Sequence, residues 1–199
     1  MPYIYDVTCV DNATVAVISS SEKYILLVSL KSGKAFKTFH TTSFCSGLTY
    51  TNGNFIVSAN KGQLQNIRLG DNKTNNICSS MSSTYVASLG NKLFSNKMDT
   101  DTIVCHKRNG EMLWTFTDKT ALNEPRCIAV DEFGNVFVAG NKSNNFVAIS
   151  SDGREHKMLL SKTDLVAKPW AIDYNIKLKF LLVANERDGQ VFVYKVNYA

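Results

Sequence analysis

The chain has 199 residues, of which 44% are hydrophobic and 20% charged, and its 3 Pro and 11 Gly exclude a disordered or low-complexity protein. No apolar run reaches the ~18 residues of a membrane-spanning helix, and the N-terminal stretch lacks the basic and apolar regions of a signal peptide. The net charge of +5 is spread thinly, so it does not by itself indicate a nucleic-acid partner. We therefore expect no membrane association.

The cysteine pattern points to a reducing compartment. The chain has five cysteines, an odd number, and none of them forms a Cys-x-x-Cys pair. This pattern predicts neither a disulfide framework nor a zinc site, and favours a cytoplasmic protein whose cysteines act as small apolar side chains.

An apolar strand, a polar turn and a second apolar strand recur five times along the chain. The copies occupy residues 7–19, 47–59, 85–96, 125–140 and 170–185. Their second strands begin at Val15, Phe55, Leu93, Val136 and Phe180, at intervals of 40, 38, 43 and 44 residues. This period is typical of WD40-like repeats, in which each repeat forms one four-stranded blade.

A third strand follows each hairpin, and a weaker fourth strand follows four of them. The third strands are predicted at 23–30, 62–69, 101–108, 145–150 and 189–196, and no segment has a sustained helical period. We therefore predict an all-β protein, a β-propeller of about five four-stranded antiparallel blades or an incomplete six. It forms one domain, 1–199, with blades at approximately 5–43, 44–83, 84–124, 125–168 and 169–199.

The fourth copy, PRCIAVDEFGNVFVA, resembles an NHL repeat, whose pattern is Pro-x-Gly-Ile-Ala-Val-Asp, a short spacer and Gly-Asn-Val-x-Val-Ala. Pro125, Asp131 and Gly134 match the pattern, whereas Cys127 stands where the family has Gly. Together with the phrase NGEMLWTFTD (109–118), this repeat makes the chain similar to the C-terminal propeller of invertebrate tripartite-motif proteins. In those proteins a RING, a B-box and a coiled coil precede the NHL-like repeats.

The resemblance implies that the full-length protein is a ubiquitin ligase and that this segment recruits its substrate. The chain has no Cys/His spacing of a RING or B-box, so we expect this segment not to be an enzyme and to bind no cofactor or metal. Such propellers usually have six blades, whereas five are present here and the last lacks a strand. Open blade edges would then favour oligomerisation.

The loops that enter the innermost strands, and those that join second and third strands, form one face of a propeller. On this face the sequence places cations, Asn and an aromatic side chain, which suit a protein or RNA partner. The predicted partner-binding residues are Lys61, Lys97, Arg126, Asn141, Lys142, Trp170, Asn185 and Arg187.

Three functions follow from this pattern. The first hypothesis is recruitment of a protein partner, and the second is binding of single-stranded RNA. A basic patch around Arg126, Lys142 and Arg187 would favour RNA, unless neighbouring carboxylates neutralise it. Those carboxylates are Glu124, Glu186 and Asp188. The third hypothesis is a lactonase-like, metal-dependent hydrolase.

A lactonase-like hydrolase needs several carboxylates at the inner strands to bind its divalent metal ion. Those strands instead begin at apolar, aromatic or thiol positions, near Val7, Gly47, Tyr85, Cys127 and Trp170. We expect three aspartates to stabilise turns between first and second strands, namely Asp11, Asp131 and Asp173. We also expect the histidines to be surface residues and not catalytic bases, namely His40, His106 and His156.

Overall fold

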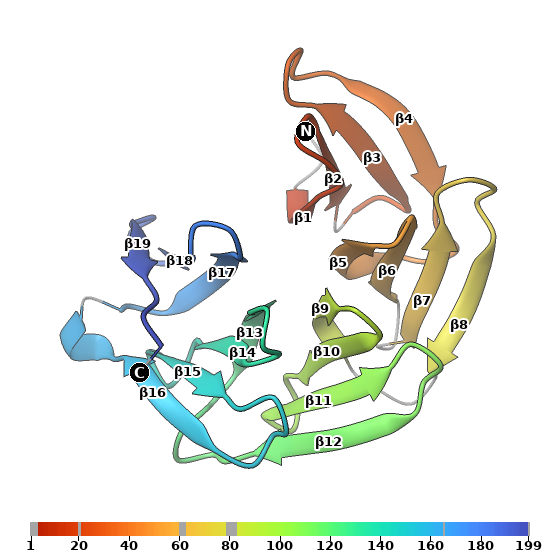
Figure 1. Ribbon diagram of the computed structural model, residues 1–199. Helices are drawn as coiled ribbons and strands as arrows, with labels where there is room; N and C mark the ends of the chain where they lie inside the picture. Colours follow the sequence, from red (N-terminus) through yellow and green to blue (C-terminus); the bar gives the residue numbers. More distant parts are fainter. Residues whose placement is uncertain (1–3, 20, 60–62, 79–82, 165, 199) are drawn as a thin grey trace.

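Five antiparallel sheets stand side by side as blades around a common axis, in the order in which they occur along the chain (Figure 1). This computed structural model describes residues 4–19, 21–59, 63–78, 83–164 and 166–198. Four blades have four strands and the last has three, so the prediction of an all-β propeller is confirmed. Within the described residues, no helix is long and apolar enough to cross a membrane.

The strands follow one another from the axis to the rim in each blade. Blade 1 contains β1 (Ile4–Cys9), β2 (Thr14–Ser19), β3 (Tyr24–Ser29) and β4 (Ala35–His40). Blade 2 contains β5 (Cys45–Thr51), β6 (Asn54–Ala59), β7 (Gln63–Arg68) and β8 (Thr74–Cys78). Blade 3 contains β9 (Ser83–Leu89), β10 (Lys92–Lys97), β11 (Thr102–Lys107) and β12 (Met112–Thr117). Blade 4 contains β13 (Pro125–Val130), β14 (Val136–Gly140), β15 (Asn145–Ile149) and β16 (His156–Leu160). After the 3-10 helix η2 (Lys162–Asp164), blade 5 contains β17 (Pro169–Asn175), β18 (Phe180–Asn185) and β19 (Val191–Lys195).

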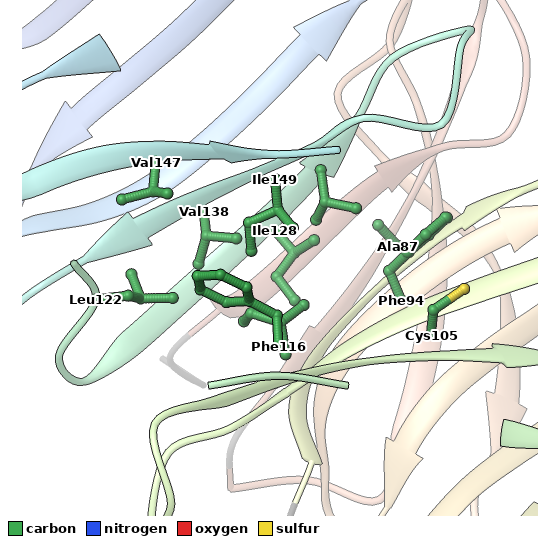
Figure 2. Packing of buried hydrophobic residues seen from close by; sticks show 11 residues of the cluster. Ala87, Phe94, Cys105, Phe116, Leu122, Ile128, Val138, Val147 and Ile149 are labelled. Carbon is green, nitrogen blue, oxygen red and sulfur yellow. The ribbon is translucent and has the colours of Figure 1, made fainter. Parts of the chain in front are cut away.

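The apolar core lies between neighbouring blades. Between blades 3 and 4, both sheets contribute to one cluster, in which Phe94, Ile128 and Val138 are buried (Figure 2). Burying a side chain of this size stabilises the fold by about 1.5–3 kcal/mol. Comparable clusters join blade 1 to blade 2 and blade 4 to blade 5. Each blade is therefore held mainly by the faces of its neighbours.

Blade 4 shows why the second strands have continuous apolar sequences. Every residue of β14, from Val136 to Gly140, is buried, because blade 3 covers one face of the sheet and blade 5 the other. A strand covered on both faces does not alternate between apolar and polar residues.

Two of the three predicted turn aspartates have that role. Asp11 Oδ1 accepts a hydrogen bond from the backbone of Ala13 at 2.8 Å, and Asp131 Oδ1 accepts one from the backbone of Asn135 at 2.8 Å. The prediction for Asp173 was wrong, because this residue lies within β17 and the longer turn of blade 5 begins two residues later. There Asn175 Oδ1 accepts from the following backbone N–H groups.

The five blades do not close the ring. Figure 1 shows an open space between blade 1 and blade 5. After β19 the chain returns towards blade 4, where Tyr198 Oη donates to Asp131 Oδ2 at 3.0 Å and lies 2.9 Å from Tyr174 Oη. The tail is therefore not a fourth strand of blade 5 within the described residues.

Gly47 of blade 2 lies directly against the backbone of blade 3, which suggests a test of inter-blade packing. A Cβ atom at Gly47 would lie 2.6 Å from Thr84 O and 2.8 Å from Tyr85 Cα, both in the backbone of β9. We expect Gly47→Ala to lower the free energy of unfolding by about 1–3 kcal/mol in urea titrations, because the two sheets must move apart. Gly70→Ala is the matched control, since its Cβ would meet no atom within 4 Å. Equal stability of the two variants would contradict the prediction.

Candidate functional site

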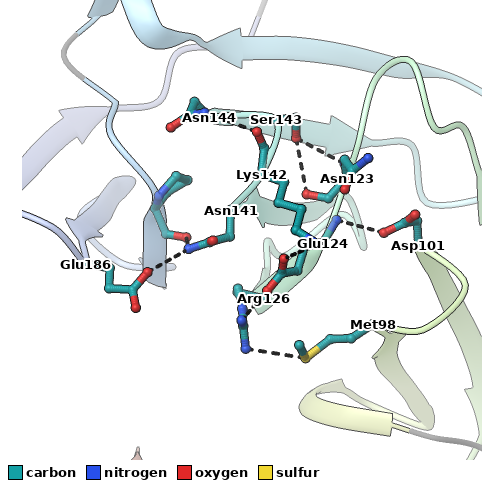
Figure 3. A network of polar contacts seen from close by, with 11 residues as sticks. Met98, Asp101, Asn123, Glu124, Arg126, Asn141, Lys142, Ser143, Asn144 and Glu186 are labelled. Atoms are coloured by element: carbon teal, nitrogen blue, oxygen red, sulfur yellow. Dashed lines mark hydrogen bonds and ion pairs between the residues drawn. The ribbon is translucent and has the colours of Figure 1, made fainter.

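A network of polar side chains joins the loops at one end of blades 3, 4 and 5 (Figure 3). Its centre is Glu124, immediately before β13. One carboxylate oxygen of Glu124 accepts a hydrogen bond from Arg126, and the other lies 3.1 Å from Lys142 Nζ. The side chains of Glu124 and Arg126 are only 17% and 15% exposed. Two of the predicted partner-binding cations are thus paired with the same carboxylate.

Arg126 also links three blades. Its guanidinium carbon lies 4.2 Å from the ring centroid of Trp170 on β17, and its Nη1 lies 3.5 Å from Met98 Sδ after β10. A guanidinium over an indole face is attracted by the ring quadrupole. Arg126 and Trp170, both predicted to contact a partner, here contact each other.

The predicted asparagines connect strands. Asn141 Nδ2 donates to Pro169 O at 3.2 Å and to Glu186 Oε2 at 3.3 Å, and Asn185 Oδ1 accepts from the backbone of Ala167 at 3.1 Å. Both are buried. Asn141 thus links blade 4 to blade 5, Asn185 holds the segment that leads into β17, and neither side chain belongs to the exposed surface.

Asn96 is a member of this set that the sequence reasoning missed. It is the penultimate residue of β10, and its Nδ2 donates to Pro125 O of the next blade, as Asn141 donates to Pro169 O. The sequence did contain a signal for Asn96, because the second-strand segments 91–96, 136–141 and 180–185 each end in an asparagine.

The remaining predicted residues stay outside the network. Lys97 is half-buried at the end of β10 and Arg187 is exposed after β18. In the part of the chain that the structure describes, neither side chain forms a hydrogen bond or ion pair with this network. Lys61 lies outside the described residues. The structure therefore brings together Arg126, Asn141, Lys142 and Trp170, and places Lys97 and Arg187 outside this network.

An acidic depression of about 460 Å³ opens beside the network, between blades 3 and 4. Its lining residues are Met98, Asp99, Asp101, Asn123, Glu124 and Lys142. Asp101 Oδ1 accepts the backbone N–H of Glu124 at 2.7 Å, whereas Asp99 is exposed and has no ionic or hydrogen-bonding partner among the described residues. Burial alone would raise the pKa of Glu124, but Lys142 and Arg126 outweigh it and hold the pKa below its ordinary value. The depression therefore carries three carboxylates and one lysine.

A second group of ionisable side chains lies where the inner strands approach the axis. Asp6 on β1 accepts hydrogen bonds at 2.8 Å from the backbone of Val7 and of Leu48, the latter on blade 2. Burial raises the pKa of Asp6 to about 7. The rings of Tyr5 and Tyr85 stack nearby, with centroids 6.0 Å apart. Sequence reasoning missed Asp6, although a carboxylate within YIYDVT was the available signal.

Other chemically reactive groups are held in neutral form. Burial raises the pKa of Cys127 to about 12, and its Sγ donates to Ile172 O at 3.3 Å, so it is a thiol at neutral pH. The expectation that His106 is a surface residue was wrong, since it is buried in β11, and burial lowers its pKa. The described residues contain no group of three His, Cys, Asp or Glu side chains placed to hold a metal ion.

Comparison with known proteins identifies a fold and not a family. No family model matches the chain, and no curated protein matches it. Among solved structures, a streptogramin B lyase is similar with a TM-score of 0.71 and 13% identity, over 98% of this chain and 69% of the lyase. A virginiamycin B lyase from Staphylococcus aureus is similar with a TM-score of 0.68 and 13% identity, over 98% of this chain and 70% of the lyase.

These similarities overturn one prediction and leave another untouched. The prediction that this segment is not an enzyme was wrong to exclude catalysis, because two solved structures that share its fold are lyases, so the fold leaves an enzymatic role open. An identity of 13% establishes a common architecture only. The chain is accordingly a β-propeller similar in fold to two lyases, while the NHL-repeat and tripartite-motif resemblance stays a prediction.

Proposed function

We propose that this propeller recognises a protein partner, and that the depression between blades 3 and 4 binds a basic segment of that partner. The observation that carries the proposal is the lining of the depression, in which Asp99, Asp101 and Glu124 outnumber the single cation, Lys142. Substrate recruitment in a tripartite-motif ubiquitin ligase, which the sequence resemblance implies, is one setting in which such a surface would act.

The same observation disfavours RNA. Binding of RNA would require a basic patch of Arg126, Lys142 and Arg187 without neutralising carboxylates, but Glu124 pairs with the first two of these cations, and Asp99 and Asp101 line the same depression as Lys142. The third, Arg187, is flanked by Glu186 and Asp188 in the chain. Because RNA affinity depends on cations that face phosphate groups, a depression lined by Asp99, Asp101 and Glu124 would repel an RNA backbone.

The depression suits a lysine or arginine with an apolar neighbour. Asp99 offers an exposed carboxylate, and Met98 beside it has a flexible thioether side chain that adapts to different partners. Since Asp101 and Glu124 are already held by hydrogen bonds and ion pairs, the rim of the depression is preorganised, which reduces the entropy cost of binding.

A second candidate function is lyase chemistry at the axis. It rests on the fold shared with two lyases and on Asp6, whose pKa of about 7 suits a general base at neutral pH. In an elimination, such a carboxylate would take a proton from carbon as the leaving group departs. The stacked rings of Tyr5 and Tyr85 would form an aromatic wall beside it.

Peptide binding tests the first proposal. We expect a fluorescein-labelled peptide of alternating Lys and Leu to bind the chain in polarisation titrations, and Asp99→Lys to weaken binding about tenfold or more, because one ion pair becomes a repulsion. Glu22→Lys is the matched control, since it makes the same charge change on an exposed loop of blade 1. Sub-micromolar binding of mixed-sequence single-stranded RNA without peptide binding would overturn the proposal.

The titration of Asp6 gives a stability test. Its pKa is higher in the folded chain than its ordinary value of 3.8, so its stabilising effect is full below pH 3.8 and is lost as the pH rises towards about 7. We expect wild type to lose about 1–3 kcal/mol more than Asp6→Asn between pH 5 and pH 8 in urea unfolding. The difference between the two proteins isolates Asp6 from other titrating groups, including His106. Parallel pH profiles would contradict the prediction.

Turnover tests the second candidate. If Asp6 is the base of an elimination, virginiamycin B incubated with the chain should be consumed and give a new product in liquid chromatography–mass spectrometry. Asp6→Asn should abolish this turnover, while Asp99→Lys should leave it intact. Absence of turnover would show that these five blades alone do not act on virginiamycin B, and would leave peptide binding unaffected.

A further inference from the structure

Blade 5 presents an apolar face to the open space between blades 1 and 5. The strand register places Leu182 of β18 beside Val193 of β19, and Ala184 beside Val191. Leu182 is 39% exposed, Val191 58% and Val193 60%. The alternate residues of β18, Leu181 and Val183, are buried against blade 4. One face of this sheet is thus packed, and the other, equally apolar face is not.

Blade 1 also presents an apolar face to this open space. The register aligns Val7 with Val17 and Val17 with Leu26, across β1, β2 and β3. Val7 is 55% exposed, and Val17 and Leu26 are half-buried. The opposite face of the same sheet packs in the cluster between blades 1 and 2. Contiguous apolar surfaces of this kind mark interaction sites or aggregation risks.

The sequences of these blades match those of blades that are covered on both faces. FLLVA in β18 occupies the same place in its sheet as VFVA in β14, whose residues are all buried. A strand that is meant to face water on one side alternates apolar and polar residues, which β18 does not do. Blades 1 and 5 therefore have the composition of blades with two neighbours.

The similar structures indicate the size of what would fill the space. Five blades cover 69% of the streptogramin B lyase, so its remaining length corresponds to about two more sheets of the same size. A second copy of this chain would bring five blades into a space of that size. Two copies joined face to face could not close a planar ring and would collide or form an open helix.

We propose that about two further four-stranded blades pack on these faces and close the ring, and that they adjoin this sequence in the same polypeptide. Every observed blade interface joins sheets that are consecutive in the chain, as β1 with β5 and β13 with β17. Blades that continue this rule are contiguous in sequence, and their apolar faces cover Leu182 and Val193 on one side and Val7 and Val17 on the other. Closure also gives β19 the chance to pair with an outer strand. The inference does not rest on the proposed function.

Cys9 provides the readout, because it is exposed on β1 on the same side of the sheet as Val7. The experiment compares the 199-residue chain with the protein expressed from its complete natural transcript, by maleimide labelling under native conditions. We expect the longer protein to contain about two additional blade repeats. We also expect the rate of maleimide labelling at Cys9 to be at least about tenfold lower in the longer protein. Thr42→Cys, at an exposed position in the connection between β4 and β5, is the control that should label equally in both proteins.

Each alternative has its own outcome. Equal labelling of Cys9 in the two proteins, or a transcript that encodes no further repeats, overturns the proposal. Protection of Cys9 in the 199-residue chain itself, with a dimeric mass in light scattering, shows that a second copy covers the face and overturns it as well. None of these results affects peptide binding at Asp99, so failure of this inference and failure of the proposed function are separable.

Discussion

A propeller blade is apolar on both faces, and this requirement for two neighbours determines the rest of the structure. Blade 4 satisfies it, and its strand β14 is buried throughout. The clusters between blades replace the single core of a sandwich, so stability depends on how closely successive sheets approach. Gly47 lies where that approach leaves no room for a side chain. The same requirement is unmet at the outer faces of blades 1 and 5.

Contacts between neighbouring blades fix the positions of the polar side chains in the loops. Arg126 belongs to blade 4, yet it contacts Met98 from blade 3 and Trp170 from blade 5. A largely buried Arg–Glu pair contributes little net stability but is costly to break, because loss of one partner leaves a buried charge. The depression that we propose for peptide binding therefore has a rigid rim, which rests on contacts that also order the blades.

Sequence predicted the local features and missed those that depend on several blades. The spacing of Val15, Phe55 and their counterparts identified the repeats, because each hairpin is a local unit. The pairing of Glu124 with both Arg126 and Lys142 needs loops from separate hairpins, so the cations looked available for a partner. Asp6 escaped notice because its hydrogen-bond donor, the backbone of Leu48, lies on another blade. Asp173 was misplaced because the turn of blade 5 is longer than in the other repeats.

The two candidate functions differ in how they depend on ring closure. The depression at Asp99 lies between blades 3 and 4, which already have both neighbours, so its shape is complete in this chain. Asp6 lies on β1, in a blade that borders the open space, and further blades would remove more water from its surroundings. Desolvation favours the protonated form of a carboxylate, and burial already raises the pKa of Asp6 to about 7 in the open ring, so ring closure would act further against its role as a base at neutral pH. The binding site between blades 3 and 4 is therefore already complete in these five blades. Chemistry at the axis would have to be measured in the closed ring as well.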